Sequence, residues 1–309
     1  MDKDIMVSVE MITYNHEKFI AQAIEGVLMQ QTNFPFELII GEDCSTDNTR
    51  QICIEYQAKY PEIIKLILQE KNIGADNNSL SIMNISKGKY VAYCEGDDYW
   101  IDPFKLQKQV DFLENNPDYS ICGGNFLLLN EDTKTLKHCY WTVKPMRKYP
   151  DGRVVTLNNY LSPYLLQTLT ICFRKEYLEG ISKFETTLDD VVWGCLLEKG
   201  KGFMFPDVFS VYRQHKGGIW TGSSRKKRLS SDLPCYEELR IHLGDKSKSI
   251  RQMYLSIYID LLYLEKNYWG ILQLIFSRDA PPTICQKLGY MIKRICIGIG
   301  SRFIGIFKK

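Results

Sequence analysis

The sequence predicts an α/β protein, with a mostly parallel sheet flanked by helices and a C-terminal helical extension. Before residue 100, four segments with strand-like hydrophobic patterns alternate with three helix-like segments. Polar residues directly follow three of these four strands, and ligands bind beyond the carboxyl ends of parallel strands. The chain has 309 residues, 45% of them hydrophobic, which is enough to bury a large core. A ligand-binding α/β domain is therefore expected.

The first four strands are short, apolar and rich in β-branched or aromatic residues. Helical periodicity fills the segments between them, and Asn15 is the expected N-cap of the first helix. The order βαβαβαβ predicts parallel neighbouring strands, because each crossover passes through a helix. The expected strands are residues 7–12, 37–41, 63–68 and 90–94, and the expected helices are residues 15–30, 49–59 and 75–86.

The patterns in the rest of the chain are weaker. Residues 130–160 are polar and irregular, so no regular element is expected there, whereas residues 229–276 predict a helical hairpin. We predict a first domain at residues 1–220 and a helical C-terminal region at residues 221–309. The other expected elements are helices at 102–115 and 189–200 and strands at 119–129, 167–174 and 208–212.

Composition excludes several classes of protein. The net charge of +2 provides no general attraction for nucleic acid, so no nucleic-acid partner is expected. Ten cysteines are scattered without a CxxC pair or zinc-ligand spacing, which favours a reducing compartment, the cytoplasm. The N-terminus has acidic residues before a strand and does not resemble a signal peptide. No apolar run reaches 18 residues, so no membrane-spanning helix is expected.

Three carboxylates surround one glycine at the end of the fourth strand, in Glu95-Gly96-Asp97-Asp98. Like charges held this close repel and raise each other's pKa unless a cation joins them. Hard oxygen ligands suit Mg²⁺ or Mn²⁺, with phosphate oxygens as further ligands. A solvated acidic turn is the alternative. The polar groups Thr13-Tyr14-Asn15 and Glu42-Asp43, expected at the same sheet edge, favour a binding site.

Two later segments also carry polar groups that could act in this site. Asp189 and Asp190 open a predicted helix, where the helix dipole alone would favour negative charge. The stretch from Arg213 to Gly218 is basic and rich in glycine, and such a loop can fold over an anion. His215 in that loop could equally be an exposed surface residue.

The tail from Ile284 to Lys309 mixes large apolar residues with six basic residues and contains no acidic residue. This composition suits an in-plane segment at an anionic membrane surface. The alternative is a C-terminal helix that packs on the domain or on a partner chain, and four glycines weaken a regular helix.

The ordered segments VSVEMITYNHEKFIAQAIEGVLMQQ, FELIIGEDCSTDNT, NIG and GKYVAYCEGDDYW resemble the family 2 glycosyltransferases, which have a GT-A-type, Rossmann-like nucleotide-sugar domain. The resemblance is strong over residues 5–125 and continues more weakly to residue 218, through FRKEYL, LDDVVWGCLLEKG and VYRQHKGG. No GxGxxG, Walker motif or GxSxG is present, which argues against dehydrogenases, P-loop proteins and α/β-hydrolases.

The resemblance implies roles for residues at the first two strand ends. Thr13, Tyr14 and Asn15 would bind the nucleotide, with Tyr14 packed against the base. Asp43 would accept a hydrogen bond from the uracil ring. Asp97 would bind the ribose or a metal ion.

The resemblance also implies a Mn²⁺ or Mg²⁺ cofactor. Asp98 would be the direct metal ligand, with Asp97 and Glu95 beside it, and Glu95 stands where the family has Asp. His215 lies where some members supply a late histidine to the metal or the diphosphate.

The implied base is Asp190, at the second acid of the family's Glu-Asp motif, with Asp189 in place of the Glu. The implied reaction transfers a sugar from a nucleotide-diphosphate sugar to a hydroxyl acceptor, with inversion at the anomeric carbon. UDP is the nucleotide that most members of the family use by default. The acceptor would be a saccharide or lipid-linked saccharide in bacterial surface polysaccharide biosynthesis, at the inner face of the plasma membrane.

Two other functions stay open at this point. A catalytically silent nucleotide-binding scaffold is suggested by Glu42, Glu95 and Asp189, which replace the usual acids, although each keeps a carboxylate. A nucleotidyltransferase would share the sheet and the carboxylates. The lack of a glycine-rich basic signature after the first strand argues against it.

Overall fold

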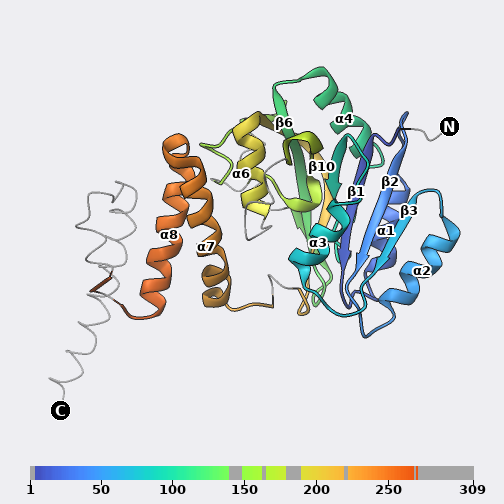
Figure 1. The fold of residues 1–309 in the computed structure, drawn as a ribbon, viewed down its shortest axis with the longest axis horizontal. Helices are drawn as coiled ribbons and strands as arrows, with labels where there is room; N and C mark the ends of the chain where they lie inside the picture. Colours follow the sequence, from blue (N-terminus) through green and yellow to red (C-terminus); the bar gives the residue numbers. More distant parts are fainter. Residues whose placement is uncertain are drawn as a thin grey trace, which may run out of the picture. The chain divides into compact units, whose positions relative to one another are not determined.

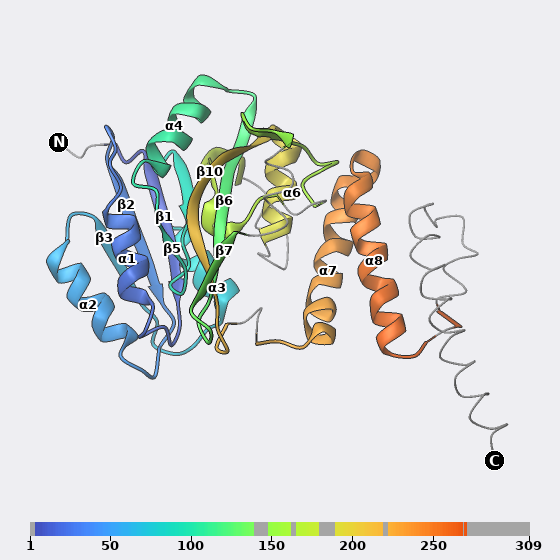
Figure 2. The ribbon, with the colours of Figure 1, turned by 180° about the vertical axis from the view of Figure 1, so that it is seen from behind.

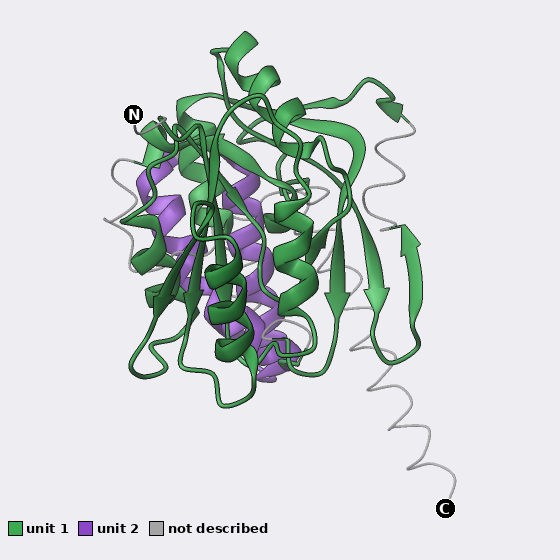
Figure 3. Ribbon diagram, turned by 90° about the vertical axis from the view of Figure 1, so that its right-hand side faces the viewer, with its two compact units in different colours: residues 1–223 green, residues 224–309 purple. Residues whose placement is uncertain are grey.

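The computed structural model describes residues 4–138, 148–161, 165–178, 189–218, 222–267 and 269–270. The chain divides into two compact units, residues 1–223 and residues 224–309 (Figure 3). The first unit holds a twisted sheet with helices on both faces, and the second holds a helical hairpin (Figure 1). The predicted fold class is confirmed.

The described residues form one mixed sheet in the order β3-β2-β1-β4-β9-β6-β10-β5, with β7 beside β6 and β8 beside β10. β1 runs parallel to both β2 and β4, and β2 runs parallel to β3. β9 lies antiparallel between β4 and β6, so it joins the first parallel group to the parallel pair β6–β10. The strands are β1 Val7–Thr13, β2 Phe36–Glu42, β3 Ile64–Leu68, β4 Tyr90–Tyr93, β5 Tyr99–Trp100, β6 Tyr119–Asn130, β7 Thr135–His138, β8 Arg153–Val155, β9 Cys172–Arg174 and β10 Lys201–Gln214.

Helices cover both faces of this sheet (Figures 1 and 2). Side chains of α1, α2 and α4 share one apolar core with alternate residues of β1, such as Val7, Val9 and Met11. α3 contacts β1 and β2, and α6 contacts β6, through the opposite face. The α-helices that the structure describes in this unit are α1 Ile20–Leu28, α2 Thr49–Lys59, α3 Ala75–Met83, α4 Lys105–Asn115 and α6 Asp189–Lys199.

Three local predictions were wrong. Asn15 does not cap the first helix, because α1 begins at Ile20 and Asn15 adopts a left-handed φ of 55°. Its Oδ1 instead accepts a hydrogen bond from the Thr46 backbone N–H at 2.8 Å, which joins the loops that follow β1 and β2.

The segment 130–160 contains β7 and β8, two short strands. Only Cys172–Arg174 of the strand predicted at 167–174 is extended.

The first half of that predicted strand is a 3₁₀ turn, Thr168–Thr170. The Leu169 carbonyl accepts hydrogen bonds from Trp100 Nε1 and from Ser210 Oγ, each at 2.9 Å. These tertiary contacts override the β-branched pattern of the segment.

The second unit contains α7 Arg225–Leu243 and α8 Lys248–Leu264, joined by the 3₁₀ turn Gly244–Lys246. The predicted helical hairpin is confirmed for these residues. The prediction for residues 284–309 lies outside the described residues. None of the helices that the structure describes is both long and apolar enough to span a bilayer.

Glu10 is a buried carboxyl group in the middle of β1, with only 3% of the residue exposed. Its Oε1 accepts a hydrogen bond from Ser86 Oγ at 2.6 Å, whereas its Oε2 has no hydrogen-bond partner in the described structure. Burial raises the pKa of Glu10 to about 7, although Ser86 and the charge of Lys175 oppose the increase. Ionised Glu10 therefore destabilises the folded state.

Glu10→Gln is expected to stabilise the protein at high pH. The folded-state pKa of about 7 lies above the ordinary value of 4.5, so the stabilising effect of this carboxyl is lost as pH rises through 7. The Gln variant should be more stable at pH 8 by about 2–3 kcal/mol, with the difference shrinking towards pH 5. Urea unfolding at both pH values measures this, with the exposed Glu62→Gln as control. A stability difference that does not vary with pH would contradict the raised pKa.

Candidate active site

A cleft of about 500 Å³ lies at the carboxyl ends of β1, β2 and β4. The register places Thr13 of β1 opposite Glu42 of β2, so the two strand ends open at the same edge. α3, α6 and the end of β10 supply the remaining walls. The polar residues that line the cleft are Thr13, Tyr14, His16, Asp43, Asn72, Asp76, Asn78, Ser79, Glu95, Asp97, Asp98, Asp189, Tyr212 and Arg213.

Tyr14 and Asp43, predicted to bind the nucleotide, both line this cleft. Tyr14 is 41% exposed, so part of its ring is open to a ligand. Asp43 is buried, and its two carboxylate oxygens accept hydrogen bonds from the backbone N–H groups of Ile73 (2.8 Å) and Gly74 (3.0 Å). These bonds hold the start of α3 against the end of β2. The carboxylate is therefore fixed in place at the cleft wall.

Two other polar residues at these strand ends shape the loops. Asn15 is absent from the cleft lining and binds Thr46, as described above. Glu42 is fully buried, forms an ion pair with Arg50 and accepts a hydrogen bond from the Ser45 backbone N–H at 2.6 Å. A nucleotide-binding role for Asn15 stays a prediction.

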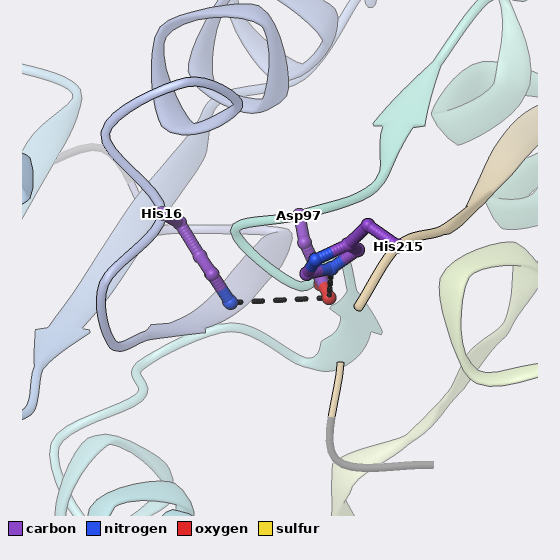
Figure 4. Close-up of side chains that lie close together, drawn as sticks. All are labelled: His16, Asp97 and His215. Atoms are coloured by element: carbon purple, nitrogen blue, oxygen red, sulfur yellow. Dashed lines mark hydrogen bonds and ion pairs between the residues drawn. The ribbon is translucent and has the colours of Figure 1, made fainter. Parts of the chain in front are cut away.

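Three side chains converge at one point: His16 and Asp97, which line the cleft, and His215, which lines a neighbouring pocket (Figure 4). His215 Nε2 lies 3.0 Å from Asp97 Oδ2, and His16 Nε2 lies 3.8 Å from the same oxygen. One potential ligand atom from each residue lies within 4.8 Å of the others. Two imidazole nitrogens and a carboxylate oxygen form a donor set that fits a divalent transition metal. We call these residues the His-Asp-His trio.

The electrostatics of the trio suit metal ligation. Burial alone would raise the pKa of Asp97, but the hydrogen bond with His215 and the nearby charges of His16 and His215 outweigh it, so the pKa is lowered. Burial lowers the pKa of His16, and Asp97 opposes this only in part. A carboxylate and a neutral imidazole are the forms that bind metals.

Glu95 and Asp98 line the same cleft but do not belong to the trio. Asp98 is buried, and its Oδ1 accepts a hydrogen bond from the Arg213 backbone N–H at 2.8 Å. Burial raises the pKa of both carboxyl groups, and the neighbouring charge of Asp97 raises them further. Their roles as metal ligands stay predictions.

Gly96 lets the acidic loop approach the end of β1. A Cβ built on Gly96 would lie 2.6 Å from Thr13 Oγ1 and 2.7 Å from Thr13 Cβ. Thr13 Oγ1 is in turn 3.2 Å from His16 Nδ1. A side chain at position 96 would therefore displace Thr13, which contacts His16.

Arg213 holds the strand end that carries His215, and the sequence patterns gave no indication of this role. Arg213 is only 6% exposed, and its guanidinium lies over the rings of Phe19 (5.0 Å) and Tyr99 (4.6 Å). Its Nη1 forms an ion pair with Glu131. The Phe19 ring also packs 4.7 Å from the His215 ring. These contacts fix His215 beside Asp97.

Asp189 lines the cleft, whereas its neighbour Asp190 is absent from the cleft lining. The Asp189 Oδ2 accepts a hydrogen bond from Thr168 Oγ1, and the Asp190 carbonyl accepts one from Tyr160 Oη at 3.2 Å. Burial raises the pKa of Asp189 to about 6, opposed by the Thr168 hydrogen bond and increased by the charge of Asp190. A carboxyl group with this pKa is suited to act as a general base near neutral pH.

Residues 8–174 match the model of the family named Glycosyl transferase family 2. The chain belongs to this family.

An uncharacterised Mycobacterium bovis protein, Mb1547, is 32% identical over 225 residues, which are 72% of this chain and 62% of the relative. The chain thus spans less than two thirds of the length of that relative. The Escherichia coli UDP-Glc:alpha-D-GlcNAc-diphosphoundecaprenol beta-1,3-glucosyltransferase WfgD is 32% identical over 74% of this chain and 85% of the enzyme.

Two solved structures share the fold of this family 2 chain. S. aureus TarS in complex with UDP-GlcNAc aligns with a TM-score of 0.62 at 18% identity, over 82% of this chain and 72% of TarS. The mannosyltransferase PcManGT from Pyrobaculum calidifontis, in complex with GDP-Man and Mn²⁺, aligns with a TM-score of 0.58 at 15% identity, over 96% and 84% of the two chains. These likenesses confirm the GT-A fold.

Proposed function

We propose that the protein is an inverting glycosyltransferase that moves a sugar from a nucleotide-diphosphate sugar to a hydroxyl group. One observation carries this proposal: Tyr14, Asp43 and Asp189 line one cleft, and the His-Asp-His trio borders it. The family membership supports the same activity. UDP is the proposed nucleotide, since WfgD is named for a UDP-sugar donor and TarS binds UDP-GlcNAc.

The nucleotide would bind between Tyr14 and Asp43. The exposed Tyr14 ring offers a face on which a base can stack. Asp43 is held rigidly by Ile73 and Gly74, and a carboxylate oxygen keeps a second lone pair that can accept the imide N–H of uracil. Thymine and guanine carry the same kind of imide N–H and could donate it to Asp43 in the same way. The identity of the base is therefore the feature of the donor that these contacts constrain least.

The proposed metal ligands are Asp97, His215 and His16. Mg²⁺ prefers oxygen ligands alone, whereas Mn²⁺ also accepts imidazole nitrogen, so two histidines favour Mn²⁺ over Mg²⁺. A divalent ion in this position supplies positive charge that stabilises the leaving diphosphate. Asp98, on the buried side of the loop, is proposed to support the ligands through Arg213.

The reaction would proceed by direct attack. The acceptor hydroxyl oxygen forms a bond to the anomeric carbon as the bond from that carbon to the diphosphate oxygen breaks, and the anomeric configuration inverts. The hydroxyl proton passes to a carboxylate within hydrogen-bond reach. The cleft lining favours Asp189 as this base, whereas the family resemblance implied Asp190.

The proposed acceptor is a saccharide or lipid-linked saccharide in bacterial surface polysaccharide biosynthesis, such as capsule, O-antigen or exopolysaccharide. WfgD supports this assignment, because its name gives a diphosphoundecaprenol-linked sugar as acceptor. Such an acceptor places the reaction at a membrane. We propose a cytoplasmic protein that contacts the inner face of the plasma membrane, with residues 284–309 as one contact.

A nucleotide panel tests the proposed function. UDP with Mn²⁺ should raise the melting temperature by several degrees, because binding stabilises the folded state, and CDP, whose base lacks the imide N–H, should raise it less. GDP and TDP, whose bases share that N–H, measure how far the site discriminates between bases. A UDP-sugar should then be slowly hydrolysed to UDP and free sugar. Tyr14→Ala and Asp43→Asn should each weaken UDP binding, with Tyr177→Phe as a control outside the cleft lining.

Two outcomes of the panel would contradict the proposal. If nucleotides bind and no donor is hydrolysed or transferred, the chain is a nucleotide-binding scaffold. If pyrophosphate is released from nucleoside triphosphates, it is a nucleotidyltransferase.

A further inference from the structure

We propose that one end of the α7–α8 hairpin docks on an anionic lipid bilayer. This surface, which we call the basic hairpin end, consists of Arg225–Arg228 at the start of α7 and Leu264, Lys266 and Trp269 at and beyond the end of α8. It lies in the described part of the second unit and does not include residues 284–309.

Charge is strongly segregated between the two units. Residues 1–223 contain 23 basic and 30 acidic residues, a net charge of −7. Residues 224–309 contain 16 basic and 7 acidic residues, a net charge of +9. The overall charge of +2 hides this difference. The residues that line the cleft all belong to residues 1–223, the acidic unit.

Of this net charge of +9, residues 284–309 carry +6 and residues 224–283 carry +3. Within residues 224–283, basic residues gather at the start of α7, where they cost helix stability. α7 opens with four consecutive basic residues and has no acidic residue in its first turn, although the helix dipole favours acids there. Arg225 Nη2 lies 2.8 Å from Asp260 Oδ2, and Lys226 Nζ lies 3.1 Å from Glu265 Oε1. These ion pairs place the end of α8 beside the start of α7. Lys227, Arg228 and Lys266 add three more basic residues to this end of the hairpin.

Large apolar side chains lie at the same end of the hairpin. Trp269 is 69% exposed, and Leu264 is 38% exposed. Tryptophan beside lysine and arginine is the composition of segments that settle at the membrane–water interface. A free phosphate would use the basic residues alone, because it offers no apolar phase for Trp269 and Leu264. A single-stranded nucleic acid could stack a base on Trp269 but offers no apolar phase for Leu264. The combination therefore favours a bilayer with anionic headgroups.

Co-sedimentation with vesicles tests the proposal on the full chain, without any sugar donor. We expect binding to phosphatidylcholine vesicles that contain 30 mol% phosphatidylglycerol, and much weaker binding to pure phosphatidylcholine or in 0.5 M NaCl. Lys226→Gln, Lys227→Gln and Arg228→Gln are combined in one variant. Each basic residue near an anionic surface contributes roughly fivefold, so this variant should partition on the order of 100-fold more weakly.

A charge-matched control replaces three exposed lysines of the first unit, Lys59, Lys137 and Lys199, by Gln, and it should bind like the wild type. Trp269→Phe gives a second readout. Brominated acyl chains should quench part of the tryptophan fluorescence of the wild type, and this part should be lost in the variant.

Three results would overturn the proposal: no binding of the wild type to phosphatidylglycerol vesicles, undiminished binding of the triple variant, or equal quenching with and without Trp269. None of them depends on sugar transfer, so they leave the proposed enzymatic function untouched. Deleting residues 284–309 separates the contribution of the tail from that of the basic hairpin end.

Discussion

Asp97→Asn is expected to lower the rate of sugar transfer by on the order of 10³ and to remove high-affinity Mn²⁺ binding. Asp97 Oδ2 is the atom that both histidines of the trio approach, at 3.0 Å and 3.8 Å. An amide has nearly the same shape but carries no negative charge, so the variant tests the charge alone. Without that charge, two imidazoles would have to hold a cation beside an uncharged amide.

Titration calorimetry with Mn²⁺ and a UDP-release assay measure this prediction separately. Asp118→Asn is the matched control, because Asp118 is an exposed carboxylate paired with Lys201, outside the cleft lining. His16→Ala should weaken Mn²⁺ binding by more than roughly 100-fold, because loss of a group that only orients a metal ligand already costs about 10- to 100-fold. If Asp98→Asn removes metal binding and Asp97→Asn does not, the ligand is Asp98, as the sequence pattern predicts.

The sheet and most helices could be predicted because local pattern and tertiary structure agree there. α2 occupies residues 49–59 as predicted, and the buried face of β1 alternates through Val7, Val9 and Met11. The exceptions depend on distant contacts. The 3₁₀ turn at residues 168–170 exists because Trp100 and Ser210, far away in sequence, donate hydrogen bonds to Leu169. No local pattern can indicate such bonds.

The cleft could be located from the sequence, but its individual ligands could not. Tyr14 and Asp43 line it as expected, because residues at the carboxyl ends of adjacent parallel strands meet at one edge. His16 was missed because it lies in a loop, where a histidine is commonly just exposed. It approaches Asp97 only because the chain turns sharply at Asn15, whose φ is 55°. That left-handed residue was interpreted as a helix cap.

The choice between Asp189 and Asp190 depends on helical phase. Successive residues of an α-helix point about 100° apart, so two adjacent acids need not both face a given cleft. The sequence could not decide which, since the answer depends on how α6 packs. In the structure Asp189 lines the cleft, and Trp193, one turn later on the same side of α6, packs 5.9 Å from the Tyr93 ring.

Asp189→Asn is therefore expected to lower the rate of transfer by about 10²–10⁴ while changing the affinity for UDP little, because the base acts on the acceptor and not on the nucleotide. Asp190→Asn should retain most of the activity. UDP release and UDP titration measure the two quantities for both variants. A larger rate loss in Asp190→Asn than in Asp189→Asn would show that the base is Asp190.

The pH dependence gives an independent test of the same base. Asp189 must be ionised to accept a proton, and burial raises its pKa to about 6. The kcat/KM for the wild type should therefore fall about tenfold per pH unit below pH 6. The hydrogen bond from Thr168 Oγ1 lowers this pKa, so Thr168→Val, which keeps the shape and removes the donor, should move the acid limb to higher pH. An acid limb that Thr168→Val does not move would mean that another group, and not Asp189, takes the proton.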